Sequence, residues 1–408
     1  MDFTKREIHD YAIYKLRGNP FPASPVPEES PKIFADQEKA LALVKGSVTD
    51  SIYSEEKRPV HIIVVGSYGN GKSHTLKVIR TSILDQLYPD NIAVAGYTST
   101  RGWSLLAVYQ GFIRDLGIDF FEETKIKILQ QVCNSEKISE ASRELVNSLL
   151  ASASTSDLFL DQMPVETRSQ ARKEIKNFLY GIIPDSDYVS AVANMFSSEE
   201  AFRISYKWIC GEWVDLFTLR RYDITSRLDS DEKALAAIVN LRRLLESIGF
   251  GMVFMCIDEL EKITLFPDQT RDNFLDAIRH IMDWNPTGLT LILSCSPEAL
   301  EAIQRYPPLD RISLRISLDP PDEVNVTKYV EAYVNIYRSE KIDDPLFPFN
   351  VDILRQMASL LSERVKLNFR NFLKLCHYAI EEGLNMKKGQ IDKEVIDHLE
   401  QRTDIYLG

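Results

Sequence analysis

Residues 66–73 place glycines, a lysine and a serine at the spacing Gly66-x-x-x-x-Gly71-Lys72-Ser73. Glycines let the backbone curl so that successive N–H groups point inward, where they and the start of a helix hold anionic phosphates. The lysine adds a positive charge at the β- and γ-phosphates, and the serine hydroxyl can ligate Mg²⁺. We therefore expect a site for ATP and Mg²⁺. The residues expected to contact the nucleotide are Gly66, Ser67, Tyr68, Gly69, Asn70, Gly71, Lys72, Ser73 and His74.

The segments on either side of this loop support that interpretation. Residues 60–65 are almost all apolar and β-branched, as in a central parallel strand. Apolar residues recur at helical spacing after the loop, for example Leu76, Ile79 and Ile83. A glycine-rich surface turn with an exposed lysine is the alternative, and the order strand, loop, helix argues against it.

A second acidic motif completes the chemistry of an ATPase. Residues 251–257 form an apolar run that ends in Asp258 and Glu259. Asp258 is expected to bind Mg²⁺, usually through water, and Glu259 to polarise the water that attacks the γ-phosphate. The alternative is a strand with a solvated acidic end. The loop upstream and the position at the carboxyl end of a strand favour the catalytic interpretation.

The remaining apolar runs predict the other strands of an α/β protein. Residues 91–100 and 288–297 indicate buried strands, and the second of these ends in the hydroxyls of Ser294 and Ser296. Residues 312–318 alternate strictly, which predicts a last strand at the edge of the sheet. Helical patterns separate the strands. The chain in order then predicts five parts: an N-terminal helix and proline-rich extended arm (1–50), a first core segment (51–119), a helical insertion (120–230), a second core segment (231–320) and a helical end (321–408).

Composition and charge narrow the function classes. The 408 residues carry a formal net charge of −12, which disfavours a broad basic surface for nucleic acid. Residues 120–230 and the helical end each hold more acidic than basic residues. The five cysteines are scattered, as in a reducing compartment. Because no signal segment and no run of about twenty apolar residues occurs, we expect a cytoplasmic protein that contacts no membrane.

The order of these motifs resembles the AAA+ ATPases. It is most similar to the clade of origin-recognition and replication-initiator ATPases, which is related to transposition-regulator ATPases and to ATPases of phage-defence systems such as BREX. Two stretches carry the resemblance: Asn19-Pro20-Phe21 followed by Phe34-Ala35-Asp36-Gln37-Glu38, and Ile257-Asp258-Glu259-Leu260-Glu261. The resemblance implies a three-layer sandwich around a five-stranded parallel sheet, with a C-terminal helical lid. The insertion at 120–230 has no counterpart that the family suggests.

The resemblance also implies roles for residues outside the two motifs. Ser294 or Ser296 matches the polar sensor that follows the fourth strand. Arg311 matches the arginine that reaches the ATP of a neighbouring subunit, with Arg315 and Arg305 as alternatives. Arg370, at a helix start, matches the lid arginine that reaches the γ-phosphate. Charges that guard an edge strand are the other explanation for the first group of arginines.

One departure from the family concerns DNA. Initiator ATPases carry a winged-helix DNA-binding domain after the lid, and the sequence ends at Gly408, about where the lid is expected to finish. We therefore expect the winged helix to be absent from this chain.

Three functions remain open from the sequence. The first is an oligomeric ATPase switch, built from copies of this chain, that acts in replication, transposition or phage defence. The second is a nucleotide-gated scaffold with little hydrolysis, in which the helices of 120–230 dock a partner protein. The third is direct DNA binding through a loop or a ring pore. The presence of both Asp258 and Glu259 favours hydrolysis, since a scaffold does not need to activate water.

Overall fold

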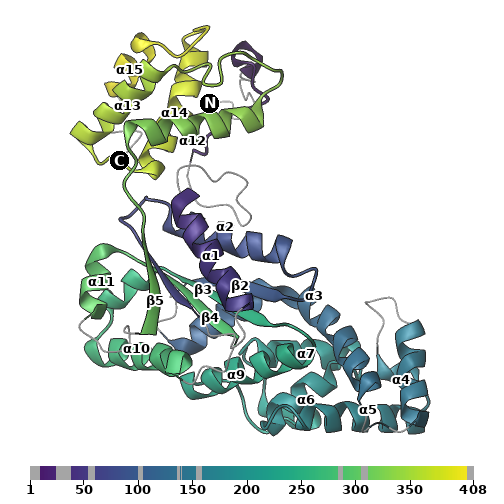
Figure 1. Cartoon of the computed structure of the whole chain (residues 1–408). Coiled ribbons are helices and arrows are strands. Elements are labelled where there is room, and N and C mark those ends of the chain that lie inside the picture. The colour runs from purple at the N-terminus through teal and green to yellow at the C-terminus, as the bar shows by residue number, and fades with distance from the viewer. Residues whose placement is uncertain are drawn as a thin grey trace.

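The computed structural model describes most of the chain. The described residues are 10–23, 38–53, 60–99, 104–135, 138, 140–152, 159–283, 288–304 and 311–401. They form a β-sheet covered by helices, a group of helices beside it, and a helical unit beyond one end of the sheet (Figure 1). None of the helices in these ranges is long and apolar enough to cross a membrane.

The sheet confirms the predicted five parallel strands. In chain order they are β1 (His61–Val65), β2 (Ala93–Ser99), β3 (Met252–Asp258), β4 (Leu289–Cys295) and β5 (Ile312–Ser317). Across the sheet their order is β2-β3-β4-β1-β5. Because all neighbours are parallel, the loops that follow β1, β4 and β3 lie side by side at one edge.

Alternate residues of β1 face two different apolar cores. Ile62 and Val64 belong to one core, and Ile63 and Val65 belong to the other. Helices therefore cover both faces of the sheet, which gives the predicted three layers and explains why the strand is apolar throughout. The helices are α1 (Glu38–Tyr53) and α2 (Lys72–Gln86) on the first face, and α3 (Leu105–Asn134), α9 (Asp231–Ser247), α10 (Asp268–Asp283) and α11 (Pro297–Gln304) on the second.

The helical insertion shares its core with the second face of the sheet. Helix α3 runs from the sheet into the insertion and bends at Gly117, whose φ is 79°. The elements that follow are α4 (Glu140–Ser152), the 3-10 turn η2 (Leu160–Gln162), α5 (Val165–Tyr180), α6 (Ser186–Asn194), α7 (Glu199–Ile209) and α8 (Leu216–Arg221). Their buried side chains belong to the same apolar core as Ile63. The boundary between 119 and 120 falls inside α3 and stays a prediction.

Two details of the insertion differ from the pattern. The helical pattern of residues 199–220 predicts one helix, but the structure has two, α7 and α8, separated by a segment that contains Gly211 with a φ of 66°. Helix α6 had no predicted counterpart. Its residues from Asp187 to Asn194 are all buried, including the polar Asp187, Ser190 and Asn194, so this short helix lacks the exposed polar face of a surface helix.

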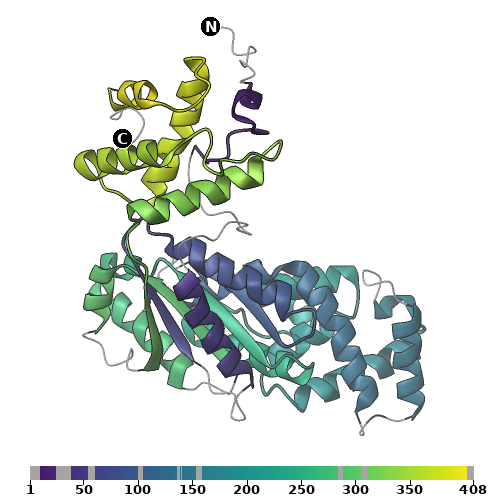
Figure 2. The same cartoon turned by 45° about the horizontal axis from the view of Figure 1, so that its top comes forward.

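The helical lid is confirmed as a separate unit with its own core. It contains α12 (Glu323–Tyr337), α13 (Val351–Arg364), α14 (Phe369–Asn385) and α15 (Lys393–Glu400). Residues 10–23 belong to this unit as well (Figure 2). Tyr14, Leu16 and Phe21 are buried in the lid core, and Asn19 donates to Glu381 at 2.6 Å.

The helix expected over residues 1–18 is wrong for its described part. Only the 3-10 turn η1 (Tyr11–Tyr14) forms, and Lys15 ends it with a φ of 55°. The next residues pair with the lid, since Leu16 bridges to Arg338 and the Arg17 N–H donates to the backbone of the α12 end at 2.9 Å. Tertiary hydrogen bonds thus replace the helical ones. Most of the extended arm, residues 24–37, lies outside the described residues, and with it all but Glu38 of the resemblance segment that begins at Phe34.

A histidine is buried at the start of β1, an inner strand of the sheet. His61 is 3% exposed, and its Nδ1 accepts the backbone N–H of Leu291 on β4 at 3.1 Å. Burial lowers the pKa of His61 from 6.5 to about 4. The folded protein therefore holds this ring neutral where the unfolded chain would protonate it.

We predict that this histidine makes the fold sensitive to acid. Above pH 6.5 the ring is neutral in both states, but between pH 6.5 and about 4 the unfolded state binds the extra proton. Stability is then lost as pH falls, by about 2–3 kcal/mol at pH 4.5. His61→Asn, which keeps an acceptor near Nδ1, should lose less stability than the wild type between pH 7 and 4.5 in urea unfolding. The exposed His280→Asn is the control, and an equal loss in wild type and His61→Asn would contradict the assignment.

Candidate active site

The residues predicted to contact the nucleotide lie together between β1 and α2. Gly69 and Gly71 adopt φ values of 83° and 86°, in the left-handed region that favours glycine. Helix α2 begins directly after Gly71, and its first intrahelical bond runs from Thr75 N–H to Gly71 O at 2.8 Å. Residues 66–74 therefore form a glycine loop that leads into a helix N-terminus, the arrangement that binds phosphate.

The ammonium group of Lys72 contacts two oxygens beside this loop. Its Nζ donates to Gly66 O at 2.8 Å and lies 3.3 Å from Glu261 Oε1. The lysine side chain is only 7% exposed, and Glu261 belongs to the 3-10 turn η3 (Leu260–Leu265) that follows β3. A buried ammonium needs such partners. A phosphate that binds the loop would take the place of the Glu261 carboxylate.

Asp258 lies at the same edge, one strand beyond β4. It is 1% exposed and accepts from three groups. Its Oδ1 accepts from the Ser294 hydroxyl and from the Glu259 N–H at 2.8 Å, and its Oδ2 accepts from Tyr97 Oη at 2.6 Å. The carboxylate is therefore fixed in one orientation.

Tyr97 connects Asp258 to the glycine loop. The Tyr97 phenol donates to Asp258, and the Ser73 hydroxyl is its neighbour on the other side. Burial and the neighbouring Asp258 carboxylate raise the pKa of Tyr97, so the phenol keeps its proton at neutral pH. The two predicted metal ligands, far apart in sequence, thus meet through a single side chain.

The site can supply what Mg²⁺ requires. The described residues contain no cluster of three His, Cys, Asp or Glu that could hold a metal by itself. The groups that converge here are oxygens, namely the Ser73 hydroxyl and the Asp258 carboxylate. Mg²⁺ takes oxygen ligands and is commonly bound by one or two protein groups together with phosphates. The residues present therefore fit Mg²⁺ bound with a nucleotide.

Glu259 stands at the end of β3 in a constrained conformation. Its φ is 61°, a left-handed value that costs a non-glycine residue about 1–3 kcal/mol and that occurs often at active sites. Its N–H points at Asp258 Oδ1, and its Oε2 lies 2.5 Å from Lys262 Nζ. The carboxylate expected to activate water is thus paired with a lysine of the adjacent η3.

The two serines after β4 have different partners. The Ser294 hydroxyl is buried and donates to Asp258, while its oxygen also lies 3.3 Å from the Glu259 N–H. Ser296 instead caps α11, since its Oγ accepts the Ala299 N–H at 3.2 Å. Of the two alternatives, Ser294 lies at the acidic pair.

The lid reaches the glycine loop through two residues at the start of α14. Arg370 lies over the Tyr68 ring, with its guanidinium carbon 4.5 Å from the ring centre, and donates to the Tyr68 hydroxyl. Asn368 packs on Gly69, where a Cβ would lie 2.6 Å from the amide group. Only glycine fits beneath Asn368. The structure thus brings Arg370 to the loop, and its contact with the γ-phosphate stays a prediction.

Of the other predicted arginines, the structure describes Arg311 and Arg315, and Arg311 lies away from the glycine loop of its own chain. Arg311 immediately precedes β5, whose first residue pairs with the start of β1, so it stands at the edge opposite the glycine loop. It is 60% exposed and binds Asp283 with an Nε–Oδ1 distance of 2.8 Å. Arg315 is exposed in the middle of β5. Arg305 lies outside the described residues.

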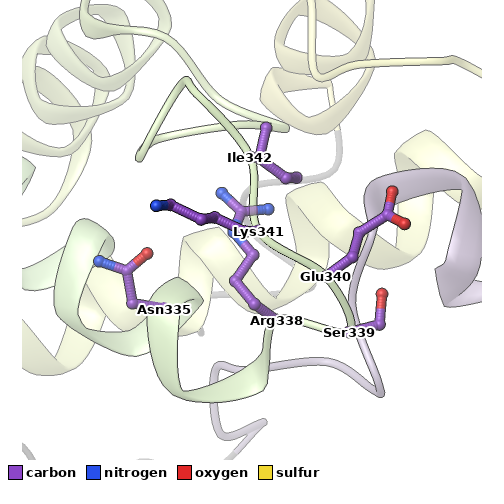
Figure 3. A pocket seen from close by; sticks show the side chains of 6 residues that line it. All are labelled: Asn335, Arg338, Ser339, Glu340, Lys341 and Ile342. Carbon is purple, nitrogen blue, oxygen red and sulfur yellow. The ribbon is translucent and has the colours of Figure 1, made fainter.

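A separate hollow of about 400 Å³ lies in the lid (Figure 3). Two of its charged side chains, Arg338 and Glu340, already serve the contact with residues 10–23. Arg338 donates to the carbonyl of Tyr14 at 3.4 Å, and Glu340 binds Lys15 at 2.6 Å. The hollow therefore gives no candidate site. It is lined by Asn335, Arg338, Ser339, Glu340, Lys341 and Ile342.

Three residues of the site were missed by the sequence interpretation. Glu261 and Lys262 follow the acidic pair directly, but a sequence does not show which charges they would face. Tyr97 lies in a predicted strand, and its role depends on β2 pairing with β3. The sequence does not specify which strand pairs with residues 91–100, so no local signal singles out this hydroxyl.

Comparison with known families agrees with this geometry. Residues 54–320 match the family model described as "BREX system ATP-binding protein BrxC/D". The chain belongs to the BrxC/D family. The match covers both halves of the site and the insertion between them. ATP binding is therefore the shared property of the family, and the expected relation to BREX ATPases is confirmed. No curated protein is similar enough to this chain to count as a relative.

Solved structures show the same fold. The ORC2 protein of Aeropyrum pernix in its ADP form is similar with a TM-score of 0.50 and 10% identity, over 91% of this chain and 70% of that one. The ORC1 protein of the same organism in complex with DNA is similar with a TM-score of 0.46 and 11% identity, over 93% and 68%. The likeness to ORC2 confirms an AAA+ fold of the origin-recognition type.

We predict that replacing each serine with alanine will distinguish the role of Ser294 from that of Ser296. Ser294→Ala removes a donor to Asp258 and should lower turnover of Mg-ATP about tenfold or more, as loss of a partner to a metal ligand does. Ser296→Ala removes the cap of α11 and should cost about 1 kcal/mol of stability. Its turnover should stay within about twofold of the wild type, because it leaves the contacts of Asp258 intact. Steady-state kinetics and urea unfolding of both variants measure this, and the reverse pattern would contradict the assignment of Ser294.

Proposed function

We propose that this BrxC/D chain is a Mg²⁺-dependent ATP hydrolase that acts as an oligomeric nucleotide switch in a DNA-associated process. The observation that carries the proposal is the convergence of Lys72, Ser73, Asp258 and Glu259 at one edge of the sheet. A site built for binding alone has no need for the second carboxylate. Membership of a BREX family supports phage defence among the three processes that the sequence left open.

Each residue has a role that its chemistry allows. The loop N–H groups and the α2 N-terminus bind the phosphates, and Lys72 exchanges Glu261 for the β- and γ-phosphates. Ser73 and Asp258 hold Mg²⁺, which supplies charge to offset that developing on the phosphates. Glu259, once free of Lys262, orients and polarises the attacking water. Arg370 leaves Tyr68 to contact the γ-phosphate from the lid.

The position of Arg311 supports self-association. At the edge opposite the glycine loop it cannot serve its own ATP, but its exposure suits contact with the ATP of a neighbouring copy. We propose Arg311 as this trans arginine. For DNA, the net charge of −12 favours contact through an assembled complex over a broad basic surface on one chain.

The alternative is a nucleotide-gated scaffold that docks a partner protein through the 120–230 helices. One observation supports a docking role: Trp213 and Phe217 are 74% and 77% exposed on the same stretch of the insertion. Aromatic residues are enriched in protein interfaces. Docking is compatible with hydrolysis, so the rate of ATP turnover decides between the two functions.

The test is a pair of substitutions assayed for binding and turnover. Lys72→Ala should abolish ATP binding because the phosphates lose their buried cation. Glu259→Gln should bind ATP within about threefold of the wild type and lower turnover about 100-fold or more, since the amide cannot accept a proton. Nucleotide binding by fluorescence and phosphate release measure the two steps. The matched control is Glu246→Gln, which makes the same change at an exposed carboxylate on α9.

The same assay separates the proposals. If the wild type binds ATP tightly but turns it over negligibly, and Glu259→Gln changes neither property, the scaffold function is supported and the hydrolase function is contradicted. A dilution series tests the trans arginine. Specific activity should rise with protein concentration in the wild type and stay low in Arg311→Ala. A flat wild-type profile would remove the trans role.

A further inference from the structure

The phenol of Tyr97 lies between the two side chains proposed to hold the metal. Tyr97 Oη donates to Asp258 Oδ2 at 2.6 Å, and the Ser73 hydroxyl neighbours the same phenol. Asp258 Oδ1 is separately occupied by Ser294 and the N–H of Glu259. Tyr97 is therefore the side chain that orients the oxygen of Asp258 on the side of Ser73.

The backbone around Tyr97 is fixed by neighbouring helices. Its N–H donates to Asp115 Oδ2 at 2.7 Å, and that carboxylate is held by Arg80 of α2 at 2.6 Å. The preceding Gly96 packs so closely on α3 that a Cβ would lie 2.5 Å from the Phe112 ring. β2 is an edge strand, so its outer N–H groups have no partner strand, and Asp115 supplies an acceptor for the N–H of Tyr97 instead. The contacts fix the main chain from which the phenol reaches Asp258.

The side chain is also placed with respect to α2. Lys77 Nζ lies 5.2 Å from the centre of the Tyr97 ring, so α2 covers the ring while its first turn supplies Ser73. Asp258 is in register with Ser99, two residues beyond Tyr97 on the paired strand. Tyr97 thus contacts both α2, which carries Ser73, and β3, which carries Asp258.

We propose that Tyr97 is a positioning residue of the magnesium site. Its phenol fixes the orientation of the Asp258 carboxylate for the metal, and the Ser73 hydroxyl turns from the phenol toward the metal when the metal binds. This inference rests on the proposed function of the same site. Hydrogen-bond partners of metal ligands typically contribute 10–100-fold to metal affinity. Removing the hydroxyl should therefore weaken Mg²⁺ and leave the phosphate contacts of the loop intact.

An opposite role for the phenol makes a different prediction. If Tyr97 were a stopper that had to leave before the metal could enter, its removal would free both Ser73 and Asp258. Metal affinity would then rise. The direction of the change in Mg²⁺ affinity distinguishes the two roles. Loss of a purely structural contact would not shift this affinity in a defined direction.

The experiment compares Tyr97→Phe with Tyr88→Phe. Tyr88 is also a partly buried tyrosine that donates to a carboxylate, that of Glu123, but it lies in the turn after α2. Binding of a fluorescent ATP analogue is measured in EDTA and during titration with Mg²⁺. Electron paramagnetic resonance of free Mn²⁺ with saturating ATP reports the metal directly. Binding in EDTA and the thermal unfolding temperature check that each variant is folded.

In EDTA, both variants should bind the analogue within about twofold of the wild type. The Mg²⁺ concentration at half-maximal effect should rise about tenfold or more in Tyr97→Phe and stay unchanged in Tyr88→Phe. An unchanged or lowered Mg²⁺ requirement in Tyr97→Phe, with the wild type binding normally, would overturn this inference alone. A wild type that binds no ATP with or without metal would overturn the proposed function and this inference with it.

Discussion

The carboxyl ends of β1, β4 and β3 lie next to one another, and the candidate site depends on this single constraint. β4 stands between the strand that leads into the glycine loop and the strand that ends in the acidic pair. Ser294, near the end of β4, therefore contacts Asp258, while β1 delivers Lys72 and Ser73 from the other side. Parallel pairing puts all three ends at one edge, and helices on both faces bury the strands that hold them there.

A site that gathers charges for a polyanion must neutralise them when the polyanion is not bound. Here the turn η3 does so with two neighbouring residues, since Glu261 faces Lys72 and Lys262 faces Glu259. The lid arginine is similarly engaged, by the ring of Tyr68. Glu259 and Lys72 are thus both paired with the same short turn. Because a triphosphate at the loop would repel Glu261, we expect its entry to move η3 and so to disturb the Glu259–Lys262 pair as well.

The sequence predicted the parts of the molecule whose pattern is local. The strands, the glycine loop, the acidic pair and the lid helices were found because apolar periodicity and motif spacing specify them directly. Helix α6 was missed because it is buried on all sides. The helix expected before Gly18 was wrong because its backbone bonds to the lid, a contact far away in sequence. Tyr97, Glu261 and Lys262 could not be assigned for the same reason: their partners come from other strands or from the folded turn after β3. The choice between Ser294 and Ser296 likewise needed the position of Asp258.

The central claim is that one metal-bound triphosphate is shared by the loop at residues 66–73 and the acidic pair at residues 258–259. A crystal structure of the chain with Mg²⁺ and a non-hydrolysable ATP analogue tests it most directly. The account predicts Lys72 on the phosphates, the metal between Ser73 and Asp258, and Glu261 displaced from the lysine. A triphosphate bound at the loop with the metal and both carboxylates turned away from each other, or a Lys72–Glu261 pair that persists beside the bound analogue, would contradict it.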